Sequence, residues 1–208
     1  RLAANGVKIS GTVRLARHDE SVAGDVVWER KTPLPRTLKV TNQNSQNLYA
    51  ECLIKTLGRL DARNQLTPGG TWKKGAKVVR AEAVKAGAKR TETVVDDGSG
   101  LSRGNSLSGR AIVAVLRRAL DAETGQVYYD SLGGPGLTGT LKRRLKNLPP
   151  GVTLRGKTGT LTGVAALSGV LDGPNGKRWL FSILANGRGT SRRSLDAIVR
   201  VLAGHLAR

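Results

Sequence analysis

The sequence contains no methionine, one cysteine, two histidines and only 3% aromatic residues. A single cysteine, Cys52, excludes an internal disulfide, and its apolar neighbours predict a small buried residue. One cysteine and two histidines without ligand spacing argue against a zinc site, so we expect neither a metal nor another cofactor. The longest uninterrupted apolar run, 111–116, is far shorter than the roughly 18 residues of a membrane span. We therefore expect no transmembrane segment.

Negative charge is also scarce, with 15 Asp and Glu against 35 Lys and Arg and a formal net charge of +20. Such a surplus of cations attracts anionic partners, of which nucleic acid is the first to consider. The basic residues are nevertheless dispersed, with no helix-turn-helix, zinc-finger or RNP pattern and no interleaved aromatic residues for base stacking. We therefore expect a solvated cationic surface and no nucleic-acid partner.

The 208 residues, 38% of them hydrophobic, are enough for one mainly aliphatic core. Alternating residues at 7–15 predict a half-buried strand, and the prolines within 32–35 indicate a loop. Apolar residues at helical spacing predict helices over 47–57, over 77–88, after a cap at Ser106 or Ser108, and over 195–206.

Strand patterns occur late in the chain, at 152–162, 164–172 and 178–186. Asp-Gly-Pro-Asn-Gly at 172–176 is a clear hairpin signal between the last two. Helices followed by an antiparallel three-strand unit and a closing helix predict an α/β (α+β) fold in layers. Residues 134–139 match G-x-G-x-x-G, but no strand precedes them and no acidic residue follows at the usual distance, so we interpret them as a loop.

Two short motifs carry chemistry. Lys157-Thr158-Gly159 lies inside a predicted strand, where lysine supplies a fixed charge, threonine donates to a carboxylate and glycine lets a substrate backbone approach. Ser45-Gln46-Asn47 places a hydroxyl and an amide at the start of a predicted helix. Each has a plain structural alternative, an edge-strand lysine for the first and a helix N-cap for the second. Their order along the chain is the one that serine acyl transfer uses.

These motifs resemble those of the class C low-molecular-mass penicillin-binding proteins, which are D-alanyl-D-alanine carboxypeptidases and endopeptidases. The resemblance covers about 42–186 and rests on four blocks, NSQNLYAE, DGSGLSRGN, GLTGTLKRRL and GKTGTLTGVAALSGVLDGPNGKRWLFSILANG. It implies a β-lactamase/transpeptidase-like fold, an antiparallel sheet flanked by helices and incomplete in this chain. It also implies a penicillin-binding serine hydrolase of the cell envelope, periplasmic or exported, whose partners are peptidoglycan stem peptides and β-lactams.

The resemblance implies roles for three catalytic residues. Ser45 would relay a proton to the departing D-alanine nitrogen, Asn47 would hold a substrate carbonyl, and Lys157 would keep Ser45 polarised. The implied substrate-binding positions are Leu101, Arg103, Thr158, Gly159, Thr160 and Thr162. Among them, Thr158 and Thr160 would bind the substrate's terminal carboxylate, with the Thr160 backbone NH as half of the oxyanion hole. Arg103 would suit an anionic diaminopimelate end of the stem peptide.

One family motif is missing. None of the serines is followed three residues later by lysine, so the S-x-x-K nucleophile motif does not occur, and Thr71-x-x-Lys74 has the spacing at the wrong place in the family's order. The chain begins at Arg1, which indicates a processed or cut N-terminus. We therefore interpret 1–208 as the C-terminal portion of a serine DD-peptidase domain. The nucleophile segment and the inserted domains would lie in a missing N-terminal part of the same protein, itself an expected partner.

Three alternatives stay open. The chain could be a complete pseudoenzyme without a nucleophile. A serine β-lactamase shares the chemistry of acylation but deacylates quickly. A noncatalytic cationic module would instead bind an anionic cell-wall polymer or nucleic acid.

Overall fold

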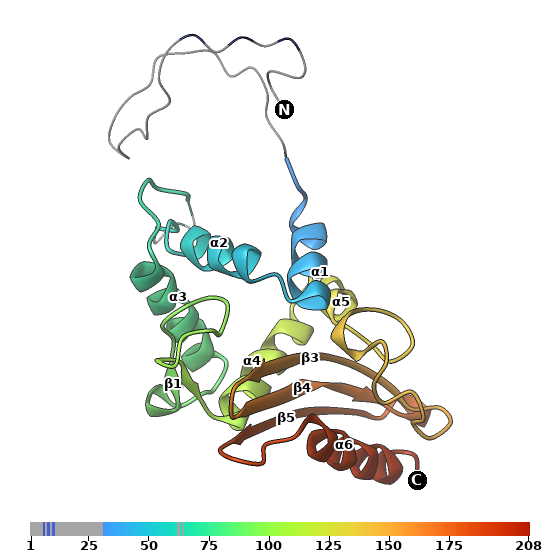
Figure 1. The fold of residues 1–208 in the computed structure, drawn as a ribbon. Helices are drawn as coiled ribbons and strands as arrows, with labels where there is room; N and C mark the ends of the chain where they lie inside the picture. The colour runs from blue at the N-terminus through green and yellow to red at the C-terminus, as the bar shows by residue number, and fades with distance from the viewer. Residues whose placement is uncertain (1–5, 7, 9, 11–30, 62, 64) are drawn as a thin grey trace. The chain divides into compact units, whose positions relative to one another are not determined.

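The computed structural model describes residues 6, 8, 10, 31–61, 63 and 65–208 (Figure 1). Contacts divide the chain into two units, 1–31 and 32–208, and every helix and strand named here belongs to the second. The strand predicted for 7–15 lies, apart from isolated positions, outside the described residues. No helix among the described residues is long and apolar enough to cross a membrane.

The larger sheet has three antiparallel strands in the order β3–β4–β5. Their bounds are β3 Thr153–Leu161, β4 Val164–Asp172 and β5 Arg178–Asn186. In register, Thr158 pairs with Leu167, and Leu167 pairs with Ile183. A short 3-10 turn, Pro174–Gly176, joins β4 to β5, so the predicted strands and hairpin are confirmed.

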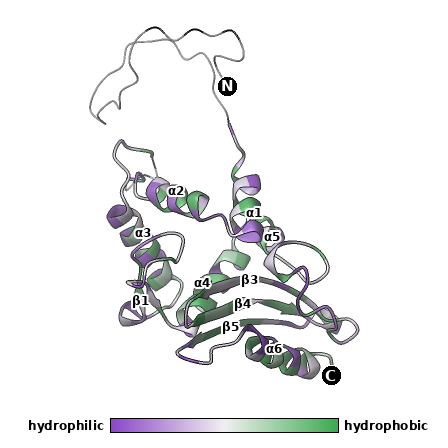
Figure 2. Cartoon of the chain, viewed as in Figure 1, coloured by the Kyte–Doolittle hydropathy of each residue, from purple (hydrophilic) through white to green (hydrophobic). Residues whose placement is uncertain are grey.

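Helices cover both faces of this sheet because strand side chains alternate between the faces. Helix α6 (Arg192–Leu206) packs on one face, where its Leu195 and Val199 join Leu167 and Leu171 of β4 in the core. On the other face, α4 (Gly109–Asp121) packs against β5. Figure 2 shows that β4 is largely hydrophobic and that α6 carries both hydrophobic and hydrophilic residues, as expected for a helix with one buried face.

Three helices precede this layered region. They are α1 Leu34–Asn44, α2 Asn47–Leu57 and α3 Trp72–Lys85. The loop predicted at 32–35 is right for 32 and 33 but wrong for 34 and 35, because proline is compatible with the first turn of a helix and α1 begins at Leu34. Helix α3 begins five residues before the predicted 77, since the Thr71 hydroxyl accepts a hydrogen bond from the Lys74 backbone NH and caps it.

Helices α2 and α3 pack closely through a glycine. A Cβ on Gly75 would lie 1.9 Å from the carbonyl oxygen of Ile54. Ile54 is the buried residue of α2, whereas Cys52 is exposed. The prediction that Cys52 is buried is therefore wrong. The face of α2 that packs against α3 contains Ile54, and Cys52 lies outside that face although its sequence neighbours are apolar.

The remaining short elements connect these layers. They are the 3-10 turn Arg90–Glu92, β1 Thr93–Val94 paired with β2 Ser106–Leu107, α5 Gly125–Ser131, and the 3-10 turn η3 Gly139–Leu141. Ser108 caps α4 by accepting from the Ala111 backbone NH, as predicted. Helix α5 had no clear sequence signal. Residues 134–138 form a loop rather than the start of a helix, which confirms the interpretation of the G-x-G-x-x-G match.

Candidate active site

The two motifs meet in the folded chain. The Nζ atom of Lys157, on β3, donates a hydrogen bond of 2.5 Å to the Ser45 hydroxyl and a second of 2.7 Å to the Thr158 carbonyl. Asn47 is two residues beyond Ser45, at the first position of α2. Residues separated by 112 positions in the sequence are thus in direct contact.

Ser45 sits at the junction of α1 and α2 in a left-handed backbone conformation with φ of 52°. The α1 end that precedes it is fixed to α5. The Asn42 amide donates to the Ser131 hydroxyl at 2.7 Å, and the buried Gln43 amide donates to the Asp130 and Leu132 carbonyls. These contacts hold the Ser45 hydroxyl toward β3. Ser45 does not cap α2, whose N-cap residue is Gln46 without a side-chain cap bond, so the plain capping alternative is wrong.

Burial lowers the pKa of Lys157 from its ordinary value. Partial burial withdraws water from the ammonium group, which disfavours the charged form. A lysine in this state can hold a hydrogen bond to a hydroxyl and exchange a proton with it more readily than an exposed lysine. This electrostatic setting suits a group that polarises Ser45.

The contact borders a cavity of about 390 Å³. Its lining residues are Ser45, Asn47, Ser99, Gly100, Leu101, Thr140, Arg144, Lys157, Thr158, Gly159, Thr160, Leu161 and Arg192. The lining contains hydroxyls and three cations but no carboxylate. Such a cavity favours an anionic ligand that can also accept hydrogen bonds.

The cavity contains most of the site residues predicted from the sequence. Leu101, Thr158, Gly159 and Thr160 line it, and Leu101 is 54% exposed and therefore open to a ligand. Arg103 and Thr162 are not among the lining residues, but they contact each other, because an Arg103 amino group donates to the Thr162 carbonyl at 2.8 Å. The structure thus joins these two residues through the Thr162 backbone rather than its side chain.

Carboxylates accept several hydrogen bonds from the loop that carries Leu101, and Asp97 accepts the largest share of them; Glu51 also accepts from the backbone NH groups of Gly98 and Ser99. Asp97 accepts from the backbone NH groups of Gly100 and Ser102 and from the Asn105 amide, each at 2.7 Å. These hydrogen bonds lower the pKa of Asp97, although burial opposes them. The acidic residue at the turn is therefore a scaffold for the loop.

Three lining residues, Thr140, Arg144 and Arg192, were not among the predicted site residues. Thr140 shares a hydrogen bond of 2.7 Å with Thr158 through their hydroxyls, Arg144 pairs with Asp196, and Arg192 donates to Thr160. They come from η3, the segment after it and the start of α6. Only tertiary packing brings these segments to β3, although the GLTGTLKRRL block that includes Thr140 and Arg144 offered a hint.

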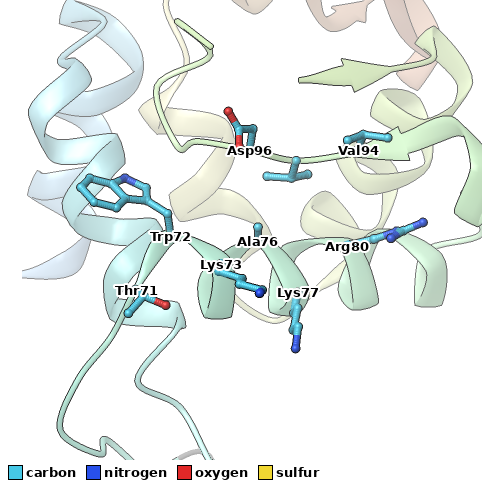
Figure 3. Close-up of a pocket in the computed structure, with 9 residues that line it drawn as sticks. Thr71, Trp72, Lys73, Ala76, Lys77, Arg80, Val94 and Asp96 are labelled. Atoms are coloured by element: carbon cyan, nitrogen blue, oxygen red, sulfur yellow. The ribbon is translucent and has the colours of Figure 1, made fainter. Parts of the chain in front are cut away.

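A second cavity, of about 540 Å³, lies along α3 and includes Thr71 (Figure 3). Lys77 points away from the segment that carries Val94 and Asp96. Lys74, the residue with S-x-x-K-like spacing from Thr71, donates its ammonium to the Gly69 carbonyl at 3.2 Å. The Thr71 hydroxyl is occupied as the helix cap, so this pair is part of a helix start and does not contribute to the Lys157 site.

Comparisons with known proteins show the family and the relatives of this chain. A sequence profile of the D-Ala-D-Ala carboxypeptidase 3 (S13) family matches residues 1–206. A D-alanyl-D-alanine carboxypeptidase from an Actinomadura species is 33% identical over 196 residues, which are 89% of this chain and 35% of that protein. DacB of Haemophilus influenzae, a D-alanyl-D-alanine carboxypeptidase, is 26% identical over 89% of this chain and 38% of its own length. The chain spans about a third of the length of these curated relatives.

Solved structures show the same fold. Penicillin-binding protein 4 of Haemophilus influenzae, in complex with a β-lactam, superposes with a TM-score of 0.79 at 25% identity, over 100% of this chain and 49% of that chain. A class A β-lactamase from Bacteroides cellulosilyticus superposes with a TM-score of 0.59 at 20% identity, over 83% of this chain and 62% of that chain. The predicted β-lactamase/transpeptidase-like fold class is confirmed.

Proposed function

The chain belongs to the D-Ala-D-Ala carboxypeptidase 3 (S13) family, and from this premise we propose that it forms one wall of the active site of a serine DD-peptidase. The observation that carries the proposal is the hydrogen bond of 2.5 Å from Lys157 to Ser45 at a cavity without carboxylates. The substrate is a peptidoglycan stem peptide ending in two D-alanines, and β-lactams bind as its mimics.

In the proposed reaction, the nucleophile is the serine of an S-x-x-K segment outside these 208 residues. Its oxygen attacks the carbonyl carbon between the two D-alanines, and the C–N bond breaks. The proton that the nucleophilic serine loses on attack passes through Ser45, which Lys157 polarises, to the departing nitrogen. The ester that forms is then hydrolysed by water, which restores the serine hydroxyl and leaves the shortened peptide as a carboxylate.

Substrate binding follows from the cavity lining. Asn47 and the Gly159 region of β3 hold the peptide backbone, and the Thr160 backbone NH stabilises the oxyanion. Thr158 and Thr160 bind the terminal carboxylate. Leu101, with Arg103 and Thr162 beside it, borders the stem-peptide side chain.

An apolar cavity supports a nucleophile segment that packs beside this chain. It has a volume of about 370 Å³ and reaches Lys157 and Gly159 from the α4 face of the sheet. Its lining is mainly apolar and includes Leu116 and Leu132. A hydrophobic segment placed here would bring its serine next to Lys157, which is the arrangement that acylation needs.

We further propose that the protein acts in the bacterial cell envelope, periplasmic or exported. Its substrate is found there, and the net charge of +20 favours contact with anionic wall polymers.

Fluorescent penicillin labelling of the protein that contains this chain together with its nucleophile segment tests the proposal. We expect covalent label on wild type. Lys157→Ala and Ser45→Ala should slow labelling about 10²- to 10⁴-fold, the usual contribution of positioned acid–base groups. Lys142→Ala, an exposed cation outside the cavity lining, is the matched control. Absence of label at every serine, or unchanged rates in Lys157→Ala, would overturn the proposal, and rapid loss of label with ring hydrolysis would identify a β-lactamase instead.

A further inference from the structure

Arg192 presents unused hydrogen-bond donors to the candidate site. It is the first residue of α6, and its Nε donates to the Thr160 hydroxyl at 3.2 Å. Its two terminal amino groups have no partner among the residues that the structure describes. A guanidinium carries five N–H donors in a planar fork, and the hydrogen bond to Thr160 uses only one of them.

The other two cations of the cavity lining are already committed. Lys157 donates to Ser45 and to the Thr158 carbonyl. Arg144 forms a two-point ion pair with Asp196, with distances of 3.2 Å from Nε and 2.7 Å from an amino group. Among the described residues, neither Lys157 nor Arg192 pairs with a carboxylate, but Lys157 already uses two of its three donors, whereas Arg192 uses one of five.

The position of Arg192 also points to an anionic ligand. A cation at the N-terminus of a helix lies at the positive end of the helix dipole, which is unfavourable unless an anion lies nearby. An anion bound between the helix start and the guanidinium would relieve this repulsion and accept the free N–H groups. The hydrogen bond to Thr160 keeps the guanidinium beside a threonine to which the proposed function assigns carboxylate binding.

We propose that Arg192 is a specificity-determining residue that binds the α-carboxylate of the residue leaving the scissile bond. The proposal rests on the proposed function. Substrates or β-lactams with this carboxylate are selected over analogues in which it is blocked, because the planar fork of arginine matches a carboxylate at two points. Arg144 and Asp196 are positioning residues, since their ion pair connects the segment after η3 to the first turns of α6.

The test compares acylation by a penicillin with acylation by its methyl ester, which lacks the carboxylate charge. The protein is again the one that contains this chain with its nucleophile segment. We expect Arg192→Gln to slow acylation by the penicillin about 10- to 100-fold, the range for loss of a hydrogen bond to a charged group, and to leave the methyl ester nearly unchanged. Arg192→Lys should restore part of the preference. Arg193→Gln removes the same charge from the same helix turn but lies outside the cavity lining, and it should keep the wild-type preference.

An unchanged preference for the penicillin in Arg192→Gln would overturn the inference, whether neither reagent or both reagents lost rate equally. A similar change in Arg192→Gln and Arg193→Gln would also overturn it, because it would indicate a general electrostatic effect. These outcomes are distinct from failure of the proposed function, in which wild type itself is not acylated. A normal melting temperature for Arg192→Gln separates lost recognition from lost folding.

Discussion

The ion pair between Arg144 and Asp196 allows a quantitative prediction of stability. Their side chains are only 17% and 12% exposed. Two guanidinium nitrogens of Arg144, Nε and one amino nitrogen, donate to the carboxylate of Asp196. Removing one partner of a fully buried pair costs about 3–5 kcal/mol, because the remaining charge is left without compensation. The residual exposure lets water reach Arg144, so we expect Asp196→Ala to lower the free energy of unfolding by about 2–4 kcal/mol.

Urea unfolding of the 208-residue chain measures this loss. A total stability of about 5–15 kcal/mol makes it a large fraction, and the melting temperature should fall by about 5–15 °C. Glu82→Ala is the control, because Glu82 pairs with Lys85 and with Arg118 while its own side chain is 46% exposed and those of its partners are 65% and 54% exposed. An exposed pair contributes about 0–1 kcal/mol.

A double variant identifies the cause of the loss. Replacing both partners, with Arg144→Met and Asp196→Leu, removes the uncompensated charge and should recover most of the stability. If Asp196→Ala destabilised the fold no more than Glu82→Ala, or if the double variant were as unstable as Asp196→Ala, the uncompensated charge of Arg144 would not be the cause of the lost stability.

Two further predictions concern the pKa of Lys157 and the close approach of Gly139 to α1. Burial lowers the pKa of Lys157 below its ordinary 10.5, so between the two values the unfolded chain binds more protons, and stability rises with pH. In urea titrations, the free energy of unfolding of wild type relative to Lys157→Met should therefore increase as the pH approaches 10.5. A decrease would mean that the hydrogen bonds of Lys157 to Ser45 and Thr158 stabilise its charged form more than burial destabilises it. Gly139→Ala should destabilise more than Gly136→Ala by about 1–2 kcal/mol in the same assay. Both glycines have φ near 70°, but a Cβ on Gly139 would lie 2.8 Å from the Gln43 carbonyl oxygen, whereas a Cβ on Gly136 would have no atom within 4 Å. Equal losses of stability in the two variants would show that α1 can shift to accommodate the extra methyl group.

Much of the site could be predicted because its signals are local. Lys157-Thr158-Gly159 lies in a strand whose alternation and following hairpin are strong patterns, and Ser45 lies directly before a helix. Thr140 and Arg192 could not be found this way, since each reaches the cavity only when η3 and α6 pack near β3. A threonine in a short turn and an arginine at a helix start are common, and only the GLTGTLKRRL block around Thr140 offered a signal.

The errors in the fold have the same physical origin. Pro33 and Pro35 indicated a loop because proline usually ends helices, yet α1 accommodates them at its start. Cys52 was predicted to be buried from its apolar neighbours, but the face of α2 that packs is decided by where Gly75 allows α3 to approach. Local composition does not contain that information.

The left-handed conformation of Ser45 lowers the stability of the fold at a residue whose hydroxyl the proposed reaction needs. A φ of 52° is strained for serine and free of cost for glycine, so glycine would favour folding by about 1 kcal/mol. Glycine has no side chain to accept the hydrogen bond from Lys157 that the serine hydroxyl accepts. Selection for thermal stability alone would therefore favour glycine at position 45. A library of variants that is screened for melting temperature rather than for acylation should lose the Ser45 hydroxyl in its first rounds.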